Sequence, residues 1–333
     1  MIRIEVTSAD LAASRFAVSP LLETMHALWT LSGRAEAGPH RAWVARWRGA
    51  YARLARRHPG LDAIAAISGN RGSANVDFIA PPPTGVRAAF ADELARMRGT
   101  PLSLAHAEIE RVLARLPRPP SPGVLEILRG PDVVRVIAEA FEAAWTEIVA
   151  AEWPRFRAVL ERDVVQRAGR LAAYGWGEAL DDLGEQVRWR AGHIELAIGP
   201  ADEMRRHELG GRGLLFLPTV FNRRVAAFLD DAWPYALIYP ARGVGVPRPA
   251  PRGLATLIGR TRARVLAELA EPATTTQLAA VLGVSLGTAG EHVAALRAAG
   301  AVAGTRTGRS VLYHRTELGD LLARAGEGPS LSP

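Results

Sequence analysis

Apolar positions along the chain follow two different periods. The segment IRIEV at 2–6 alternates and is β-branched, which predicts a strand. Helical spacing dominates from there to about residue 172, broken by the turn-rich segments VDFIAPPPTG at 76–85 and RLPRPPSPG at 115–123. We expect helices from Ala9 with Ser8 as the cap, from Pro20, from Pro39, and near 86–98, 103–116, 131–150 and 154–172.

The pattern changes after Gly192, where HIELAIG, GLLFLPTVF, RVAAFL and YALIYPA are short β-rich runs split by Gly, Pro and Asp. These runs predict a small antiparallel sheet, which IRIEV would join. The segment VGVPRPAPRG at 244–253 has the Pro and Gly content of a linker. The class expected is therefore α+β, mostly α. Its parts are a helical N-terminal domain with a small sheet at 1–245, a linker at 246–252, a C-terminal domain at 253–325 and a disordered tail at 326–333.

The stretch TTTQLAAVLGVSLGTAGEHVAAL at 274–296 joins two short apolar-periodic segments at a corner. Thr274 and Gln277 match a capping box, Gly283 can take the left-handed conformation that ends a helix, and Ser285 can cap the next helix. The inward positions are Leu278, Ala279 and Leu282 on the first segment and Ala289, Val293 and Leu296 on the second. This arrangement predicts a helix-turn-helix.

The flanking segments extend the motif. A helix is expected over 253–272, with Leu254, Leu257, Ile258, Val265, Leu266 and Leu269 available for burial. The segment at 301–316 predicts two short strands around a turn at Thr307–Gly308, with Arg306 and Arg309 on either side of that turn. A short helix, ELGDLLARA, follows. The order is that of a winged helix-turn-helix, with the recognition helix at 285–299 and the wing at 301–316.

The run LIGRTRARVLAELAEPATTTQLAAVLGVS, with HVAALRAAGAV and GRSVLYHRT, resembles the ArsR-type (ArsR/SmtB-like) bacterial transcriptional regulators. The resemblance covers roughly a fifth of the chain. The segments FAVSPLLE, VDFIAPPP, GGRGLLFLPTVF and YALIYPARG resemble the domain fused ahead of such a motif in actinobacteria. The resemblance implies a repressor or activator, with repression favoured, that binds double-stranded DNA as a homodimer through helices 254–270 and 317–325.

The chain departs from the family pattern, and these departures limit which properties of the family we expect it to share. Metal-sensing members have a Cys motif before the corner, whereas this chain has no cysteine, so thiolate metal sensing is excluded. We expect no cofactor and no metal, and a small-molecule effector is left open. The family usually has a polar residue where Gly290 stands and often a basic one where Glu291 stands, so base readout is expected to differ.

Candidate DNA contacts follow from the motif. Thr288, Glu291 and His292 are assigned to the major groove, and Ser285 to a phosphate at the helix N-terminus. The arginines of the wing are assigned to the DNA backbone or the minor groove. The full set is Thr276, Ser285, Leu286, Thr288, Glu291, His292, Arg297, Arg306, Thr307 and Arg309. Structural alternatives remain, because Ser285 can be only a cap, His292 only a packed or surface residue, and the wing arginines only a solvated hairpin tip.

Charge does not by itself locate the DNA-binding part. The net charge is +7 and all 41 basic residues are arginine. Between Gly253 and Ala325 there are eight arginines and five acids, so the excess is spread over the chain. No apolar run reaches the roughly 18 residues of a membrane span, and MIRIEVTSADLAASRF does not resemble a signal peptide. We therefore expect a cytoplasmic protein with no membrane partner.

Other features have both a functional and a structural interpretation. Trp43, Trp47, Tyr51 and Leu54 share one face of an Arg-rich helix, which suits a nucleic-acid stacking platform but is more typical of a core stripe. GGRG at 210–213 is interpreted as a turn rather than a phosphate loop. The pairs His193 with Glu195 and His207 with Glu208 are interpreted as surface polar residues rather than metal ligands.

The function favoured by these observations is a sequence-specific transcriptional regulator that is not an enzyme. Two alternatives stay open. The N-terminal domain could be catalytic with the winged helix as an accessory, or the winged helix could contact protein rather than DNA. For a regulator, the N-terminal domain could sense a ligand, bind a partner or set the geometry of the dimer.

Overall fold

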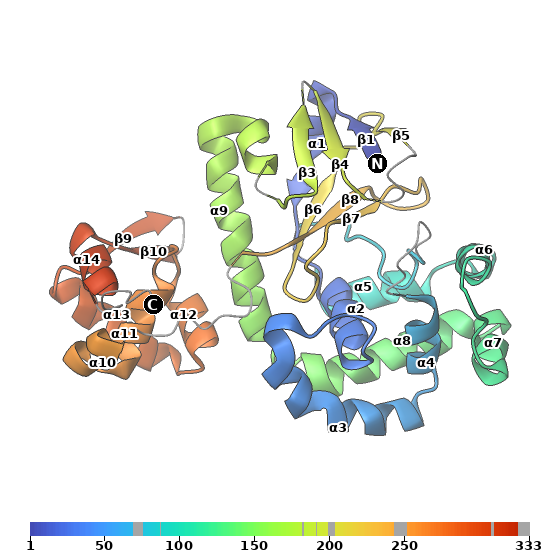
Figure 1. Ribbon diagram of the computed structural model, residues 1–333, viewed down its shortest axis with the longest axis horizontal. Helices are drawn as coiled ribbons and strands as arrows, with labels where there is room; N and C mark the ends of the chain where they lie inside the picture. Colours follow the sequence, from blue (N-terminus) through green and yellow to red (C-terminus); the bar gives the residue numbers. More distant parts are fainter. Residues whose placement is uncertain are drawn as a thin grey trace, which may run out of the picture. The chain divides into compact units, whose positions relative to one another are not determined.

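The computed structural model describes residues 1–68, 76–86, 88–181, 183–190, 192–198, 204–242, 252–307 and 310–325 (Figure 1). The chain divides into two compact units. The first contains Met1–Trp153 and Arg167–Arg242, and the second contains Pro154–Gln166 and Gly243–Pro333. Helices predominate beside small sheets, so the expected α+β class is confirmed.

Helices of the first part of the chain are α1 (Ser8–Ala13), α2 (Pro20–Leu31), the 3-10 turn Gly38–His40, α3 (Arg41–Arg57), α4 (Gly60–Ile67), α5 (Phe90–Arg98), α6 (Leu102–Leu113), α7 (Pro122–Arg129), α8 (Val133–Ala144), the π-turn Trp145–Val149 and α9 (Trp153–Leu180). The sequence pattern missed α4 and α7. Both are eight residues long and directly follow a proline or a proline-rich segment, where periodicity carries little signal.

The start of α1 differs from the prediction. Thr7, not Ser8, is the cap, because Asp10 at the third helical position completes a capping box with Thr7. The Thr7 N–H donates to Asp10 Oδ2 at 2.9 Å, and the Asp10 N–H donates to Thr7 Oγ1 at 3.2 Å. The reciprocal pair satisfies two backbone donors at the start of α1, the N–H groups of Thr7 and Asp10.

Helix α8 lies at the centre of the helical part of the first unit, where α2, α4 and α5 contact it. The crossing of α4 with α8 requires a glycine. A Cβ atom at Gly60 would lie 2.5 Å from the carbonyl oxygen of Val136 and 3.0 Å from the Ala140 Cβ. Gly60 therefore lets the two helix backbones approach closely.

Two four-stranded sheets accompany these helices, in the orders β3-β4-β1-β5 and β2-β6-β8-β7. Their strands are β1 (Ile2–Glu5), β2 (Arg15–Phe16), β3 (Val187–Arg190), β4 (His193–Leu196), β5 (Arg205–Glu208), β6 (Leu215–Thr219), β7 (Ala226–Phe228) and β8 (Ala236–Pro240).

The prediction of one antiparallel sheet is wrong. The strands form two sheets of mixed direction, with β1 parallel to β5, β2 parallel to β6, and β6 parallel to β8. Strand β1 does join the later strands, between β4 and β5. Alternation along a strand indicates its two faces but not its partners, because pairing joins residues far apart in sequence.

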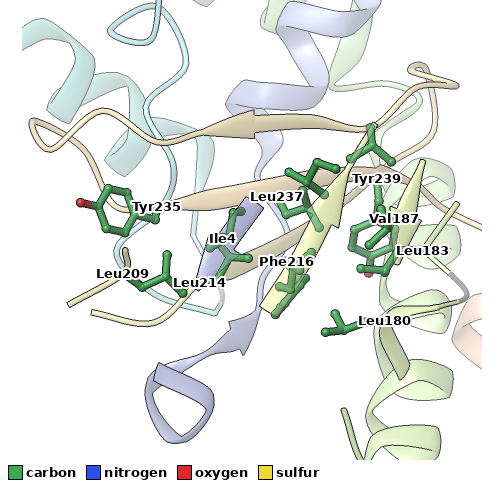
Figure 2. Packing of buried hydrophobic residues seen from close by; sticks show 13 residues of the cluster. Ile4, Leu180, Leu183, Val187, Leu209, Leu214, Phe216, Tyr235, Leu237 and Tyr239 are labelled. Carbon is green, nitrogen blue, oxygen red and sulfur yellow. The ribbon is translucent and has the colours of Figure 1, made fainter. Parts of the chain in front are cut away.

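The two sheets and the end of α9 share one apolar core (Figure 2). Ile4 of β1, Phe216 of β6 and Leu237 of β8 are each at most 1% exposed. Leu180 at the end of α9 is fully buried in the same cluster. This core fixes the sheets to each other and to the C-terminal end of the long helix.

Buried carboxylates hold irregular backbone in place in the first unit. Glu23 of α2 accepts from the Val220 N–H at 3.2 Å, and Glu93 of α5 accepts from the Leu21 N–H at 2.8 Å. Glu108 of α6 accepts from the Phe78 N–H at 2.8 Å. The turn-rich segment at 76–83 is thus a buried loop, and a buried loop needs such partners for its backbone donors.

One buried carboxylate lies beside a second acid. Burial raises the pKa of Asp77 to about 7, and the charges of Glu108 and Asp230 add to the effect. Burial also raises the pKa of Glu108. The Asp77 side chain therefore titrates near neutral pH, and it lies in the buried loop described above.

The second unit contains α10 (Arg252–Ile258), α11 (Arg260–Glu268), α12 (Thr275–Leu282), α13 (Leu286–Ala298), β9 (Val302–Thr307), β10 (Ser310–Arg315) and α14 (Glu317–Ala325). The single helix expected over 253–272 is broken at Gly259, whose φ of 86° no helix accommodates. Leu254, Val265, Leu266 and Leu269 are buried as expected, whereas Leu257 is 72% exposed.

The first half of α9 belongs to this second unit. Within the unit, Arg162 Nη1 of α9 lies 3.4 Å from Glu268 Oε2 of α11, and both side chains are about nine-tenths buried. No single helix in the described part of the chain is long and apolar enough for a membrane span; α12 and α13 reach that composition only as a pair bent by 115°.

Candidate nucleic-acid interface

The corner between α12 and α13 is built by three local devices, all of which the sequence predicts. Thr274 and Gln277 form a capping box, with the Thr274 N–H donating to Gln277 Oε1 at 2.8 Å. Gly283 ends α12 in the left-handed conformation with φ of 67°. Ser285 caps α13 by accepting from the Thr288 N–H at 3.0 Å. The direction of α13 is therefore set by short-range hydrogen bonds.

Both helices bury the faces that their spacing predicts. Leu278, Ala279 and Leu282 of α12 are at most 8% exposed, as are Ala289, Val293 and Leu296 of α13. Val284 in the turn packs on the same cluster, together with residues of α10, α11 and α14. The opposite side of α13 is consequently presented to solvent as a fixed surface.

The wing pairs in a register that differs from the prediction by one position. Thr307 lies opposite Ser310, and Arg306 lies opposite Val311. Thr307 therefore belongs to β9, whereas the sequence places it in the turn at Thr307–Gly308. Gly308 and Arg309 lie outside the described residues.

Arg315 attaches the wing to the helices. Its Nε donates to the Leu266 carbonyl oxygen at 2.6 Å and its Nη2 donates to the Ala267 carbonyl oxygen at 2.8 Å. These carbonyls close α11, where a cation is favoured by the helix dipole. No local sequence signal distinguishes Arg315 from the other arginines, so this anchoring role is a finding of the structure alone.

The candidate contact residues differ in exposure. Ser285, Leu286, Glu291, Arg297, Arg306 and Thr276 are exposed, and Thr288 and His292 are half-buried. The side chain of Thr307 is outside the described part. Two further exposed arginines, Arg260 and Arg262 on α11, were not among the predicted contacts. Their alternation with small residues in RTRAR is the only signal that could have indicated them.

The most exposed side of α13 carries unusually small side chains. Its exposed positions Gly287, Ala294 and Ala298 carry at most a methyl group, and Glu291 is the charged residue among them. A Cβ at Gly290 would have its nearest neighbour, Thr275 Cγ2, at 3.9 Å, so no steric constraint demands this glycine. Such a surface lets the helix backbone come close to a partner, with one carboxylate at its centre.

Three predicted contacts have intramolecular partners. The Thr288 hydroxyl lies 2.8 Å from the Ser285 hydroxyl, so the two side chains act together at the start of α13. The Arg297 guanidinium lies 5.9 Å from the ring centroid of Tyr313 in β10, near the limit for a cation–π contact. The structural role of Ser285 as a cap is therefore shown, and it is compatible with an additional role at a phosphate.

The glycine-rich segment at 210–213 already holds an anion from its own chain. Asp10 Oδ1 accepts from the Gly211 N–H at 2.7 Å and from the Gly213 N–H at 3.4 Å. Burial alone would raise the pKa of Asp10, but its hydrogen bonds from Thr7, Gly213 and Gly211 outweigh burial and lower it. The segment is thus a turn closed on a carboxylate, as its interpretation as a turn predicts.

The aromatic stripe of α3 is a core stripe. Trp43 is 7% exposed and Leu54 is fully buried, while Trp47 and Tyr51 are half-buried. Trp43 and Leu54 are therefore core residues, and the half-buried Trp47 ring has the Arg46 guanidinium 5.3 Å from its centroid. The arginines of α3 lie on the other side of the helix and are exposed.

The two histidine–glutamate pairs differ in geometry. His193 Nε2 lies 3.2 Å from Glu195 Oε1, and His193 is 8% exposed. His193 is therefore buried, and its interpretation as a surface residue is wrong. His207 packs edge-on against Tyr235 instead. Within the described residues, no group of three or more histidines and acids is placed to hold a metal ion.

Comparison with known protein families supports the motif. A family model for a helix-turn-helix domain matches residues 258–305, from the end of α10 to β9. Neither the curated proteins nor the solved structures contain a match to the chain. The C-terminal part of this chain therefore carries a helix-turn-helix domain, a class of domain typical of DNA-binding transcriptional regulators.

Proposed function

We propose that this protein is a sequence-specific transcriptional regulator of the ArsR type, most simply a repressor, and that it acts by binding rather than by catalysis. The observation that carries the proposal is the build of α13. One face is anchored in the core by Ala289, Val293 and Leu296, and the other is a fixed, small-residue surface at the helix-turn-helix position. A wing of two paired strands follows it.

The chemistry of this surface suggests how bases would be read. Glu291 repels phosphate but accepts a hydrogen bond from the amino group that cytosine presents in the major groove. Leu286, which is 57% exposed, would make apolar contact with a thymine methyl group. Thr288 and His292 flank Glu291 on α13 and supply donors. Small residues around Glu291 would let its short side chain reach the base edges.

Affinity would come from exposed arginines rather than from the small-residue side of α13. Arg306 on the wing and Arg297 at the end of α13 are exposed and suited to phosphate contacts. Arg260 and Arg262 at the start of α11 add positive charge to the same unit. Because phosphate contacts carry no sequence information, these arginines and Glu291 are separable in a binding experiment.

A homodimer is also part of the proposal. Leu257 of α10 and Leu318 and Leu321 of α14 are 72%, 45% and 54% exposed, and the two helices contact each other. An exposed apolar surface shared by two helices is typical of a protein interface. A twofold dimer would read two half-sites about 34 Å apart. Leu257→Glu with Leu321→Glu should convert a dimer to a monomer in sedimentation velocity, and a wild-type monomer at micromolar concentration would count against this part.

The decisive test is fluorescence-anisotropy binding to the DNA upstream of the protein's own gene, with unrelated duplex as competitor. We expect preference for the upstream DNA. Arg306→Ala should weaken binding to every duplex and lower the salt slope by about 1, whereas Glu291→Gln should change the preference among base substitutions in the site. Arg135→Ala is the matched control, because Arg135 is exposed but ion-paired with Glu139 on α8 at 2.9 Å.

Binding that never exceeds the unrelated duplex would contradict the proposed function. Equal effects of Arg306→Ala and Arg135→Ala would place the DNA contact elsewhere. If Glu291→Gln left the base preference unchanged, α13 would not be reading bases through that carboxylate.

A further inference from the structure

The exposed side of α3 carries a concentration of positive charge that the helix-turn-helix does not use. This helix has six arginines and no acid in 17 residues. The helix-turn-helix region from Gly253 to Ala325 has a surplus of only three arginines over acids. Helix α3 therefore carries a higher density of positive charge than the region that contains the helix-turn-helix.

The arginines of α3 fall into two groups. Arg46 and Arg57 at one edge are ion-paired, with Glu152 at 3.0 Å and Glu147 at 2.7 Å. The remaining arginines are exposed, and the described residues provide no ion-pair or hydrogen-bond partner for them: Arg41, Arg48, Arg53 and Arg56. Four guanidinium groups thus face solvent, spread over about 22 Å along the helix axis at 1.5 Å per residue.

The residues that lie between these arginines on the surface of α3 have small side chains. Ala42, Ala45, Gly49 and Ala52 are all exposed on the same side of α3. Nothing larger than a methyl group separates the guanidinium groups, so an extended polyanion can approach the helix without displacing bulky side chains. Helix α3 lies at the periphery of the first unit, next to α2 and α4 (Figure 1).

We propose that the exposed arginine face of α3, made of Arg41, Arg48, Arg53 and Arg56, binds the phosphate backbone of duplex DNA without sequence preference. Charge complementarity supplies the attraction, because neutralising phosphates releases their condensed counterions. An anionic membrane fits less well. Membrane-surface helices insert an apolar face, and the apolar face of α3 is buried, with Trp43 7% and Leu54 0% exposed.

The inference rests on the proposed function only for the choice of DNA as the polyanion. Its consequence is a second DNA contact, made by the first unit, which raises affinity for any duplex and leaves base readout to α13. The face would lengthen the footprint on DNA beyond what a helix-turn-helix covers.

The test compares two triple variants of the full-length protein on an unrelated duplex. One is Arg48→Ala with Arg53→Ala and Arg56→Ala. The control is Arg98→Ala with Arg129→Ala and Arg135→Ala, which removes the same charge from exposed arginines that are already ion-paired. Alanine favours helix at each position, and Trp43 and Trp47 on the other side of α3 report folding by fluorescence.

We expect the α3 variant to lower the slope of log affinity against log salt by up to about 2.7, since each phosphate contact contributes about 0.9. Raising the salt from 50 mM to 200 mM would then weaken the wild-type protein about 40-fold more than the variant. The control should keep the wild-type slope. Equal slopes for the two variants, or loss of binding to phosphatidylserine vesicles with no change on DNA, would overturn the inference.

The two proposals fail separately. A wild-type protein that shows no preference for its upstream DNA, yet loses salt slope in the α3 variant, would refute the specific regulator and keep the α3 contact. Full preference for the upstream DNA, with the wild-type salt slope in the α3 variant, would refute the α3 contact and keep the specific regulator.

Discussion

Gly319→Ala sets two known effects against each other in the second unit. Gly319 lies within α14, where alanine is favoured over glycine by about 1 kcal/mol. Sterically, however, a Cβ at this position would lie 2.1 Å from the carbonyl oxygen of Ala301 and 3.2 Å from the Arg315 Cβ. The first atom is backbone, so it cannot turn aside as a flexible side chain would.

The steric effect should prevail. Relief of the contact requires α14 to move by more than 1 Å, judged against an ordinary contact distance of about 3.5 Å. The movement would strain the hydrogen bond from the Thr316 N–H to the same Ala301 oxygen, now 3.1 Å. Overpacking typically costs about 1–3 kcal/mol and a lost hydrogen bond about 1 kcal/mol, so we expect a net destabilisation near 2 kcal/mol.

The positions of the tryptophans allow the stability of the two units to be measured separately. All eight tryptophans lie between residues 29 and 233, outside α10 to α14. Tryptophan fluorescence therefore follows the first unit, and hydrogen exchange of peptides from 260–325 follows the second. Gly319→Ala should reduce protection of those peptides about 30-fold, as 2 kcal/mol requires, and leave the urea midpoint of fluorescence unchanged. Unchanged or increased protection would refute the steric reasoning.

Three further predictions use the same assays. Gly287→Ala is the converse case, because its Cβ would have no neighbour closer than the Ser285 Oγ at 3.8 Å. Protection of α13 against hydrogen exchange should therefore rise by up to about fivefold. A decrease in protection would contradict the helix-propensity argument. Arg315→Met removes two hydrogen bonds to the end of α11 and should lower protection of the wing and α11 together, by about 1–3 kcal/mol; an effect limited to β10 would count against the anchoring role. Asp77 has its pKa raised to about 7 by burial and by neighbouring acids, so the folded protein binds that proton more tightly than the unfolded chain does. The stability of the first unit should therefore fall as pH rises from about 4 to about 7 and level off above, with Glu93 adding to the trend, and Asp77→Asn should flatten the fall in urea midpoints; an identical pH profile for the variant would exclude Asp77 as a source.

The sequence by itself determined the helix-turn-helix, down to single residues. The capping box at Thr274, the left-handed Gly283 and the cap at Ser285 act over three or four residues, so local spacing contains all the information they need. The same holds for the buried faces of α12 and α13. Local spacing also indicated that the runs after Gly192 are strands, and that the glycines at 210–213 form a turn.

The tertiary structure decided everything that joins distant segments. It divided the strands between two mixed sheets and placed β1 between β4 and β5. It also showed that the loop at 76–83 is buried on Glu108, that Asp10 fills the glycine-rich turn, and that Arg315 fastens the wing. The physical reason is common to these cases. A buried polar group or a strand edge is satisfied by whichever partner the fold brings near, and a short window of sequence does not contain that partner.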